Sequence, residues 1–251
     1  MLYEIIFSPT GGTSNVSRKL SAAWDGEKKE IDLFRRDYEN KLPELTDCDV
    51  CIISAPVYSG RIPSAAAERL KLIKGCGAKA VAVTVYGNCK IGDAMAEMED
   101  ILDGCGFRVI AGISAVAEHS LIRSIAAKRP DAADAEALEN FGRQITAKIN
   151  SGDLSKPVLP GNRPYKPYGH GLHPYVRSGC INCGICAREC PADAISFGGN
   201  WVTDPEKCIS CMHCVRFCPQ SYRILDPKQL EALSERLAPI AAERQEDRLY
   251  I

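Results

Sequence analysis

The sequence predicts a doubly wound α/β domain with a five-stranded parallel sheet, followed by a small α+β domain rich in cysteine. Over residues 1–150, apolar strand-like runs alternate with helical patterns, as in a parallel sheet covered on both faces. Residues 151–175 are rich in Pro, Gly, Tyr and basic residues, a composition typical of an extended linker. Two runs of four cysteines then define a compact domain over residues 176–226.

The individual elements of the first domain follow from hydrophobic periodicity and length. Short apolar runs predict strands at 2–7, 29–33, 50–55, 80–86 and 108–115. Helical patterns lie between and after them, at 13–24, 63–73, 91–102 and 131–149. In the last helix the apolar residues recur at helical spacing, and Asp131 is placed to cap the first turn.

Composition and charge narrow the class of protein. Hydrophobic residues make up 45% of the 251 residues and charged residues 25%, which is ordinary for a soluble globular chain. No apolar run reaches the roughly 18 residues of a membrane span, so membrane insertion is not expected. Lys and Arg number 31 against 32 acidic residues, so no basic field for nucleic acid exists at the level of the whole chain. Residues 1–8 lack the marks of a signal peptide, and we expect a cytoplasmic protein.

The two cysteine runs share the pattern C-x2-C-x2-C-x3-C-P, ending before Pro191 and Pro219. Such spacing is typical of two-cluster bacterial ferredoxins, where three close thiolates hold one [4Fe–4S] cluster and the fourth Cys crosses to the other cluster. Zinc needs only four ligands per ion and would leave the third Cys of each run unexplained, and disulfides need an oxidising compartment. The expected ligand sets are Cys180, Cys183, Cys186 with Cys218, and Cys208, Cys211, Cys214 with Cys190.

The cysteine domain is an internal duplication with an offset of 28 residues between the runs. We match the segment 194–196 after the first run with 223–225 after the second. Residues 227–251 are expected to form a C-terminal helix. Its apolar stripe would consist of Leu230, Leu233, Leu237 and Ile240.

The segment after the first predicted strand resembles the phosphate loop of flavodoxins, [ST]-x-T-G-x-T. Hydroxyls and backbone N–H groups at a helix N-terminus bind a phosphate without Lys or Arg. The alternative interpretation is a Gly turn with Thr13 or Ser14 as an ordinary N-cap. The candidate phosphate ligands are Ser8, Thr10, Gly11, Gly12, Thr13 and Ser14.

Two further loops are expected at the same edge of the sheet. With the strand order 2-1-3-4-5, FMN lies at the switch point between strands 1 and 3, outside their carboxyl ends. The loops after strands 3 and 4 each carry a tyrosine and a glycine, which suit a flat ring, although each tyrosine is equally compatible with a packing role at the rim of the core. These candidate residues are Pro56, Val57, Tyr58, Ser59 and Gly60, then Tyr86, Gly87 and Asn88.

Residues 1–150 thus resemble flavodoxins, and residues 176–226 resemble a bacterial-type ferredoxin with two clusters. The whole chain resembles the flavodoxin–ferredoxin fusion family. The resemblance implies FMN and two [4Fe–4S] clusters in an electron-transfer protein that works between a donor and an acceptor protein. Because a cluster moves one electron and FMN one or two, the hypothesis is a relay that links one-electron and two-electron partners.

Two other functions are compatible with the sequence. One is a flavin-dependent reductase of a small molecule, fed by the ferredoxin domain, with His119 and Arg123 as its first candidate residues. The other is a flavin-free domain that only docks a partner. Cys89 lies in a predicted flavin loop, where we favour a packing role over redox activity.

Overall fold

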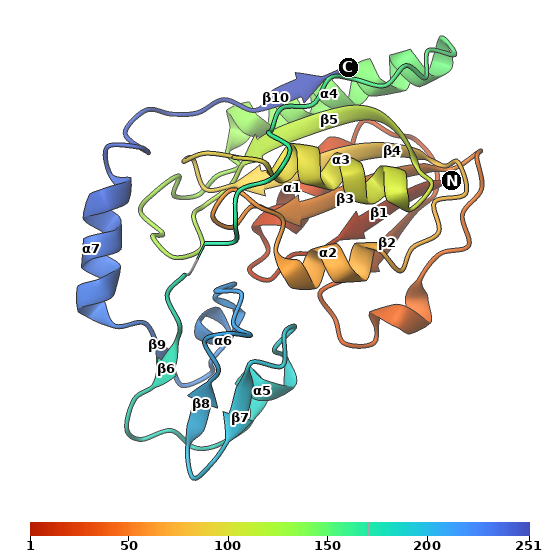
Figure 1. Cartoon of the computed structure of the whole chain (residues 1–251). Coiled ribbons are helices and arrows are strands. Elements are labelled where there is room, and N and C mark those ends of the chain that lie inside the picture. The colour runs from red at the N-terminus through yellow and green to blue at the C-terminus, as the bar shows by residue number, and fades with distance from the viewer. Residues whose placement is uncertain (170) are drawn as a thin grey trace.

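The computed structural model describes residues 1–169 and 171–251, and its larger domain is built on a parallel sheet (Figure 1). The strands β1 (Leu2–Ile6), β2 (Lys28–Asp32), β3 (Val50–Pro56), β4 (Lys79–Tyr86) and β5 (Arg108–Val116) lie in the order β2-β1-β3-β4-β5, all parallel. This is the flavodoxin-like order. The predicted fold class is confirmed.

Helices cover both faces of this sheet, because successive strand residues point to opposite sides. Helices α1 (Gly12–Ser21) and α4 (Ala132–Asn150) bury apolar residues on one face. Helices α2 (Ser64–Leu70) and α3 (Ala94–Gly104) cover the other, while the short 3-10 helix η1 (Tyr38–Lys41) buries none of its residues. The β3 neighbours Ile52 and Ile53 belong to the two different cores. Both are fully buried.

Asp131 caps α4 as the sequence predicts. Its carboxylate accepts from the backbone N–H groups of Ala133 and Asp134. The Asp134 carboxylate accepts in return from the Asp131 N–H at 2.8 Å. The four groups form a capping box, which satisfies donors that a helix start would otherwise leave unpaired.

The linker is extended, but it is docked on the α/β domain along α3. Leu159 is buried, and its side chain fills the space beside Gly112 of β5. The carboxylate of Asp93 accepts from the backbone N–H groups of Asn162 and Lys166, both at 2.9 Å. The linker therefore has a fixed path over the larger domain.

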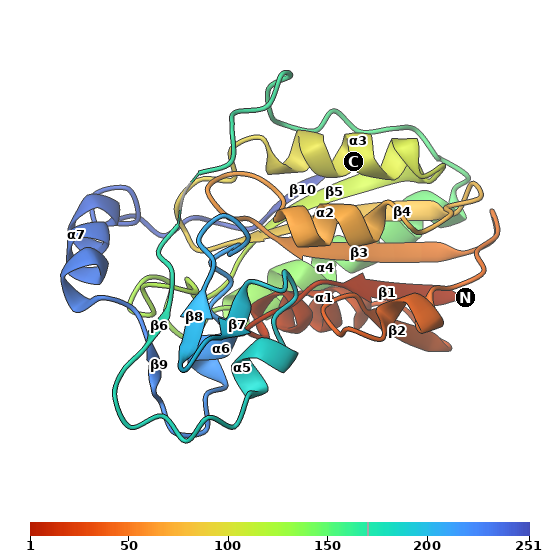
Figure 2. The same ribbon diagram turned by 60° about the horizontal axis from the view of Figure 1, so that its bottom comes forward.

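The cysteine domain consists of two short two-stranded sheets and two one-turn helices. Strand β6 (Tyr175–Val176) pairs with β9 (Arg223–Ile224), and β7 (Ile195–Phe197) with β8 (Trp201–Thr203), both antiparallel. Helix α5 (Ile185–Arg188) lies within the first cysteine run and contains Cys186, and α6 (His213–Arg216) lies within the second and contains Cys214. Figure 2 shows this domain beside the α/β domain.

The internal repeat keeps the offset of 28 residues beyond the cysteines. The backbone N–H of Ala194 donates to the Cys190 sulfur, and that of Tyr222 donates to the Cys218 sulfur, both at 3.3 Å. Tyr222 therefore corresponds to Ala194, and Arg223 corresponds to Ile195. Our sequence match was wrong by one residue, because the backbone turn after each Cys-Pro, rather than side-chain similarity, sets the register.

The C-terminal segment differs from the predicted single helix. Helix α7 (Pro227–Leu237) starts at the Asp226 cap and ends shortly before Pro239, which cannot continue a helix. The chain then runs back to the sheet, where β10 (Arg248–Tyr250) pairs antiparallel with β5 as a sixth, edge strand. The expectation of a helix up to residue 251 and of only five strands is corrected.

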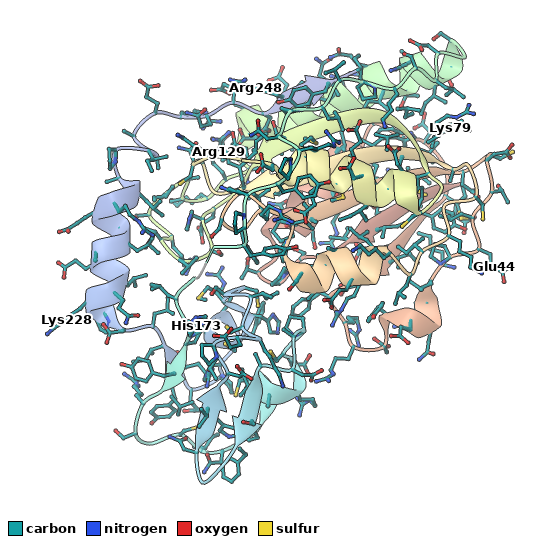
Figure 3. All side chains as sticks on the ribbon, in the orientation of Figure 1. Glu44, Lys79, Arg129, His173, Lys228 and Arg248 are labelled. Atoms are coloured by element: carbon teal, nitrogen blue, oxygen red, sulfur yellow. The ribbon has the colours of Figure 1, made fainter. Side chains whose placement is uncertain are left out.

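Among the described residues, none of the helices combines the length and apolar character needed to cross a membrane. Figure 3 places His173 at the start of the cysteine domain and Arg129 in the α/β domain.

Candidate functional site: two cysteine-lined cavities and the neighbouring sheet edge

The eight cysteines of the two runs surround two separate cavities. The first, here the Cys180 cavity, has about 380 Å3 of space, part of it open to solvent, and is lined by Cys180, Cys183, Cys186, Cys218 and also Cys214. The second, the Cys208 cavity, has about 360 Å3, likewise partly open, and is lined by Cys190, Cys208, Cys211 and Cys214. Each cavity thus contains the four cysteines that the sequence assigns to one cluster, including the fourth Cys of the other run, and Cys214 borders both cavities. Within residues 1–169 and 171–251, no three Cys, His, Asp or Glu side chains meet closely enough to hold a single metal ion.

Backbone geometry brings the sulfurs of each run to one side. Asn182 and Gly184 both have positive φ, which folds the first run into a tight loop, and Ser210 and Met212 do the same in the second. The two loops are equivalent under the offset of 28. The spacing of the cysteines predicts these tight loops, because the two residues between successive cysteines must turn the chain.

The sulfurs of the Cys208 cavity are buried, which favours the protonated thiols when no metal is bound. Burial raises the pKa of the Cys214 thiol to about 11 and that of the Cys211 thiol further still. A metal that binds the thiolate compensates for this cost of desolvation. Burial also acts to raise the pKa of Cys218, but backbone N–H groups of the following turn outweigh it, and the pKa is lowered.

Polar atoms without partners point to the same conclusion. The indole N–H of Trp201 and the Nε–H of Arg223 are buried and donate to no protein atom, and both residues line the Cys180 cavity. A buried donor requires an acceptor. The sulfur atoms of a cluster are acceptors. The lining therefore fits an iron–sulfur group.

The predicted phosphate loop lies between β1 and α1. Gly11 has φ +92, a left-handed conformation that favours glycine, and it occupies the N-cap of α1 without a side-chain hydrogen bond. The first turn of the helix contains no acidic residue. The Ser14 N–H donates to the Ser8 hydroxyl at 3.0 Å. The helix N-terminus thus presents backbone donors without a competing carboxylate, which suits an anion.

The loop after β3 is a tight turn. Tyr58 and Arg61 exchange two backbone hydrogen bonds of 3.0 and 3.1 Å, and the two residues between them, Ser59 and Gly60, both have positive φ. The space in front of Gly60 is occupied by the ammonium group of Lys166 from the linker and by Gly92. The close approach that we predicted at Gly60 is therefore made by the chain itself. Val57 and Pro56 lie at the end of β3, where the Val57 N–H donates to the Val85 carbonyl at 2.8 Å.

The loop after β4 differs from its predicted role. The side-chain amide of Asn88 donates to the carbonyls of Ala241 and Glu243 and accepts from the Gln245 N–H, at 2.9 to 3.1 Å. Asn88 therefore anchors the C-terminal segment, and its amide has no free donor for a ligand. Tyr86 is buried beside the same segment, and burial raises its hydroxyl pKa.

Gly87 packs against His119 of the loop after β5. A Cβ atom at Gly87 would lie 2.5 to 2.8 Å from three atoms of the histidine side chain. The Nδ1 atom of His119 accepts from the backbone N–H groups of Leu121 and Ile122, so the imidazole is held as the Nε2–H tautomer. Burial lowers its pKa. Arg123 pairs with Glu118 instead of turning toward this ring.

The cysteine domain contacts the α/β domain at the phosphate loop. Nδ1 of His213 lies 2.7 Å from the Pro9 carbonyl, which makes Nδ1 the donor, and its ring packs between Phe34 and Phe217 with centroids 4.5 Å from each. His213 also lines both cavities. The hydroxyl of Tyr58 is buried, and the nearby Cys211 adds to the rise of its pKa.

A second contact joins the domains from the other side. Arg69 of α2 is buried and donates to the carbonyls of Leu33, Phe34 and Pro191 at 2.6 to 2.8 Å. Pro191 directly follows the last Cys of the first run. The cluster cavities are therefore held next to the carboxyl edge of the sheet.

Sequence reasoning missed three residues of this site: His213, Arg69 and Arg223. His213 and Arg69 act across the domain interface, and a sequence contains no signal for a contact between distant segments. Arg223 had a signal. It is a single cation beside apolar residues after the last Cys. An alignment of the two repeats at the constant offset makes it the equivalent of Ile195.

The comparisons with known proteins match two different parts of the chain. Residues 179–222 match the family model of the 4Fe-4S dicluster domain. Ferredoxin Fdx2 of Sorangium cellulosum is 54% identical over 35 residues, which are 14% of this chain and 35% of that ferredoxin. A ferredoxin-like protein in the nif region of Sinorhizobium fredii is 47% identical over 34 residues, 13% of this chain and 53% of that protein. The chain thus spans a third to a half of the length of these relatives.

Solved structures resemble the larger domain. The two-electron reduced flavodoxin of Megasphaera elsdenii matches 57% of this chain and 99% of its own length, with 18% identity and a TM-score of 0.40. A flavodoxin from the domain Archaea matches 60% of this chain and 99% of its own, with 15% identity and a TM-score of 0.42. The fold assignment rests on the parallel strand order rather than on these scores.

The fold and the cysteine cavities define the class of protein: a flavodoxin-like α/β domain joined to a 4Fe-4S dicluster domain. This is the domain organisation of a flavodoxin–ferredoxin fusion.

Proposed function

We propose that the protein transfers electrons between redox partner proteins by way of two [4Fe–4S] clusters and one FMN. When bound, each cluster carries one electron at a time and FMN one or two, so the pair connects one-electron and two-electron partners. The observation that supports the proposal most directly is the grouping of eight cysteines around two neighbouring cavities, each of which contains one of the expected sets of four.

In this proposal each cavity holds one cluster. Cys180, Cys183, Cys186 and Cys218 bind the first, and Cys190, Cys208, Cys211 and Cys214 bind the second. The crossing of the fourth Cys places both clusters within one small domain. Since Cys214 and His213 line the Cys180 cavity as well, the two cavities are neighbours.

The phosphate loop would hold the FMN phosphate at the start of α1. Gly11 and Gly12 leave the backbone N–H groups accessible, and the hydroxyls of Thr10 and Ser8 add donors. The contact of His213 with the Pro9 carbonyl puts this loop beside the clusters. The Tyr58 hydroxyl of the loop after β3 is near Cys211, a cysteine of the Cys208 cavity.

The test of the proposal is anaerobic purification with iron and flavin counts, followed by a spectroelectrochemical titration. We expect about eight iron atoms and about one FMN per chain, from two four-iron clusters and one flavin site. Reduction by a one-electron donor should bleach both the cluster absorption and the flavin absorption, in the order set by their reduction potentials. A chain with clusters but no flavin would support the docking-scaffold function, and about two zinc ions per chain would overturn the redox function.

A substitution in the phosphate loop tests the FMN site separately. Thr10→Val removes one hydroxyl at nearly constant size, and the loss of one hydrogen bond to a charged group, on the order of 1.5–3 kcal/mol, should weaken FMN binding at least tenfold. Thr146→Val is the matched control, because its hydroxyl bonds to the Gly142 carbonyl within α4. Flavin fluorescence during dialysis measures both. Equal FMN retention by the two variants would place the phosphate elsewhere.

A further inference from the structure

Arg223 is a buried cation in the middle of the cysteine domain. Its exposed fraction is 2%. Its Nη2 donates to the Pro174 carbonyl at 3.0 Å and to the Thr203 hydroxyl, and its Nη1 to the Trp201 carbonyl at 3.4 Å. All three acceptors are neutral.

The positive charge of Arg223 has no carboxylate opposite it. Among the residues that the structure describes, no ion pair involves this guanidinium. Two other buried arginines have one, since Arg61 pairs with Glu97 and Arg129 with Asp134, whereas the buried Arg69 donates only to backbone carbonyls. An unpaired buried charge is costly, so a compensating negative group is expected next to Arg223.

The Cys180 cavity is the place for that group. Arg223 lines it, and its Nε–H is a buried donor without an acceptor. The indole N–H of Trp201, which lines the same cavity, is a second one. The charge of Arg223 acts on Cys186 of the first ligand set and also on Cys208 and Cys214 of the second. Donors and charge thus converge on cysteine sulfurs.

The other half of the duplicated domain lacks this arrangement. The residue equivalent to Arg223 is Ile195, and it lines the Cys208 cavity. Two cavities related by an internal repeat therefore differ at one corresponding position, apolar in one and cationic in the other.

We propose that Arg223 is the internal counter-ion of the iron–sulfur clusters and gives the cluster in the Cys180 cavity the higher reduction potential of the two. The inference rests on the proposed function, since it requires clusters in both cavities. Reduction adds a negative charge to a cluster, so a buried cation and N–H donors to sulfur favour the reduced form. The charge of Arg223 also reaches Cys208 and Cys214 of the second cluster. Of the two cavities, however, Arg223 and Trp201 line the Cys180 cavity, so their N–H donors favour the first cluster.

The order of potentials has a consequence for the path of electrons. The Cys208 cavity is the one next to Tyr58 and the predicted flavin loops. The cluster closer to FMN would then be the stronger reductant, and the cluster farther away would store the electron. The counter-ion thus gives the two halves of a symmetric domain different tasks.

The test is a redox titration of the full-length protein with its clusters, followed by electron paramagnetic resonance. In Arg223→Ile, which introduces the residue of the equivalent position, the higher of the two cluster potentials should fall by at least a tenfold change in the one-electron equilibrium, about 59 mV. The two potentials should also approach each other. Arg223→Lys should retain most of the wild-type value, because it keeps the charge, whereas Arg223→Gln should fall as Arg223→Ile does.

Arg177→Ile is the matched control. Arg177 follows Val176, which pairs with Arg223 across β6 and β9, but its side chain is solvent-exposed over the Tyr222 ring. The same loss of charge there should leave both potentials unchanged, because water screens it. A titration in which Arg223→Gln or Arg223→Ile leaves both potentials at the wild-type values overturns the inference.

Iron counts separate the two levels of the argument. A wild-type protein without about eight iron atoms per chain would contradict the proposed function itself. If Arg223→Ile does not retain its iron, Arg223→Gln and Arg223→Lys decide the question. If each cluster has the same potential in Arg223→Gln as in Arg223→Lys, the charge of Arg223 has no effect and its role is purely structural.

Discussion

At the scale of single residues, the site depends on positions where a side chain would not fit or would not be paired. Gly87 is such a position, because the imidazole of His119 lies where its Cβ would be. The two backbone N–H groups on Nδ1 prevent the ring from moving away. The sequence placed Gly87 in a predicted flavin loop but did not indicate its contact with His119, since the loop after β5 is 32 residues away in the chain.

Substitution of Gly87 should therefore destabilise the edge of the sheet. In Gly87→Ala we expect the free energy of unfolding to fall by about 1–3 kcal/mol, the usual cost of overpacking. Gly104→Ala is the control, because no atom lies within 4 Å of its added Cβ, and a helical Ala should raise stability by about 0.5–1 kcal/mol. Chemical denaturation measures both. Equal stability of the two variants would contradict the contact.

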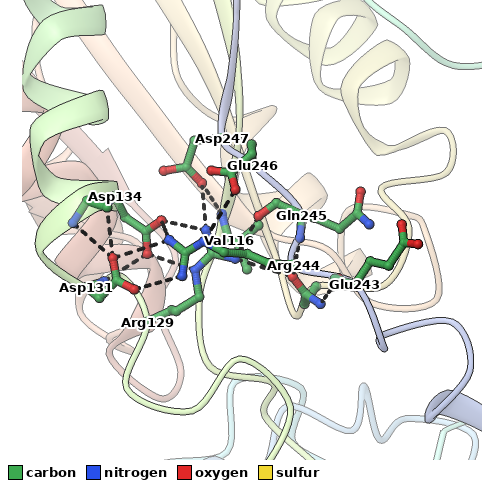
Figure 4. Close-up of polar contacts among 11 residues, drawn as sticks. Val116, Arg129, Asp131, Asp134, Glu243, Arg244, Gln245, Glu246 and Asp247 are labelled. Carbon is green, nitrogen blue, oxygen red and sulfur yellow. Dashed lines mark hydrogen bonds and ion pairs between the residues drawn. The ribbon is translucent and has the colours of Figure 1, made fainter.

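At the scale of elements, the sequence predicts what local pattern determines and misses what tertiary contact determines. All five parallel strands and four helices of the α/β domain fall within three residues of their predicted starts, because each has its own hydrophobic period. Strand β10 was missed. Its pattern is short, and it is a strand only because β5 offers a free edge and because Asn88 holds the preceding segment. Arg129 bonds to the Gln245 carbonyl and Arg244 to Asp134 in the same region (Figure 4).

The candidate site divides in the same way. The spacing within each run predicts three converging cysteines, because a tight loop needs no distant partner, whereas the predicted crossing of Cys190 and Cys218 came from the resemblance to two-cluster ferredoxins. The flavin loops could be located from the strand order, but the role of Asn88 could not, since its partners come from a segment more than 150 residues further along the chain.

The attachment of β10 should strengthen as the pH falls. Asp247 is buried, its Oδ1 accepts from the Val116 N–H at 2.8 Å, and its Oδ2 has no partner. Burial raises its pKa to about 6, with Asp134 and Glu246 adding to the rise and Arg129 opposing it. Because this pKa lies above the unfolded value of about 3.9, the folded state binds more protons in between, and stability increases as the pH falls toward that value.

Asp247→Asn should remove this dependence. Between about pH 7.5 and about pH 5, the opening free energy of the β10 amides should rise by about 1 kcal/mol in the wild type and remain level in the variant. Hydrogen exchange, corrected for the intrinsic effect of pH, measures it. Asp25→Asn, in an exposed turn, should behave as the wild type. An identical pH response of Asp247→Asn and the wild type would refute this role of Asp247.

At the scale of the whole molecule, the chain joins its two domains at the place where their cofactors would meet. Two hydrogen bonds between the domains involve the cysteine loops: Arg69 bonds to the Pro191 carbonyl, and His213 bonds to the Pro9 carbonyl. Because both ends of the His213 contact belong to predicted cofactor loops, the contact fixes the distance between the phosphate loop and the cavities rather than merely attaching one domain to the other.

Loss of the His213 contact should slow electron exchange between clusters and flavin without removing either. His213→Phe keeps the stacking on Phe34 and Phe217 but lacks the hydrogen bond to Pro9, and a loss of about 1 kcal/mol reduces the docked population roughly fivefold. His213→Ala also loses the stacking and should be slower still. Stopped-flow reduction, recorded at the cluster and flavin absorptions, gives the rate, and iron and flavin counts verify the cofactors. Arg236→Ala, on the exposed side of α7, serves as the control. Unchanged rates in His213→Ala with full cofactor content would mean that the domain contact at Pro9 does not govern the exchange.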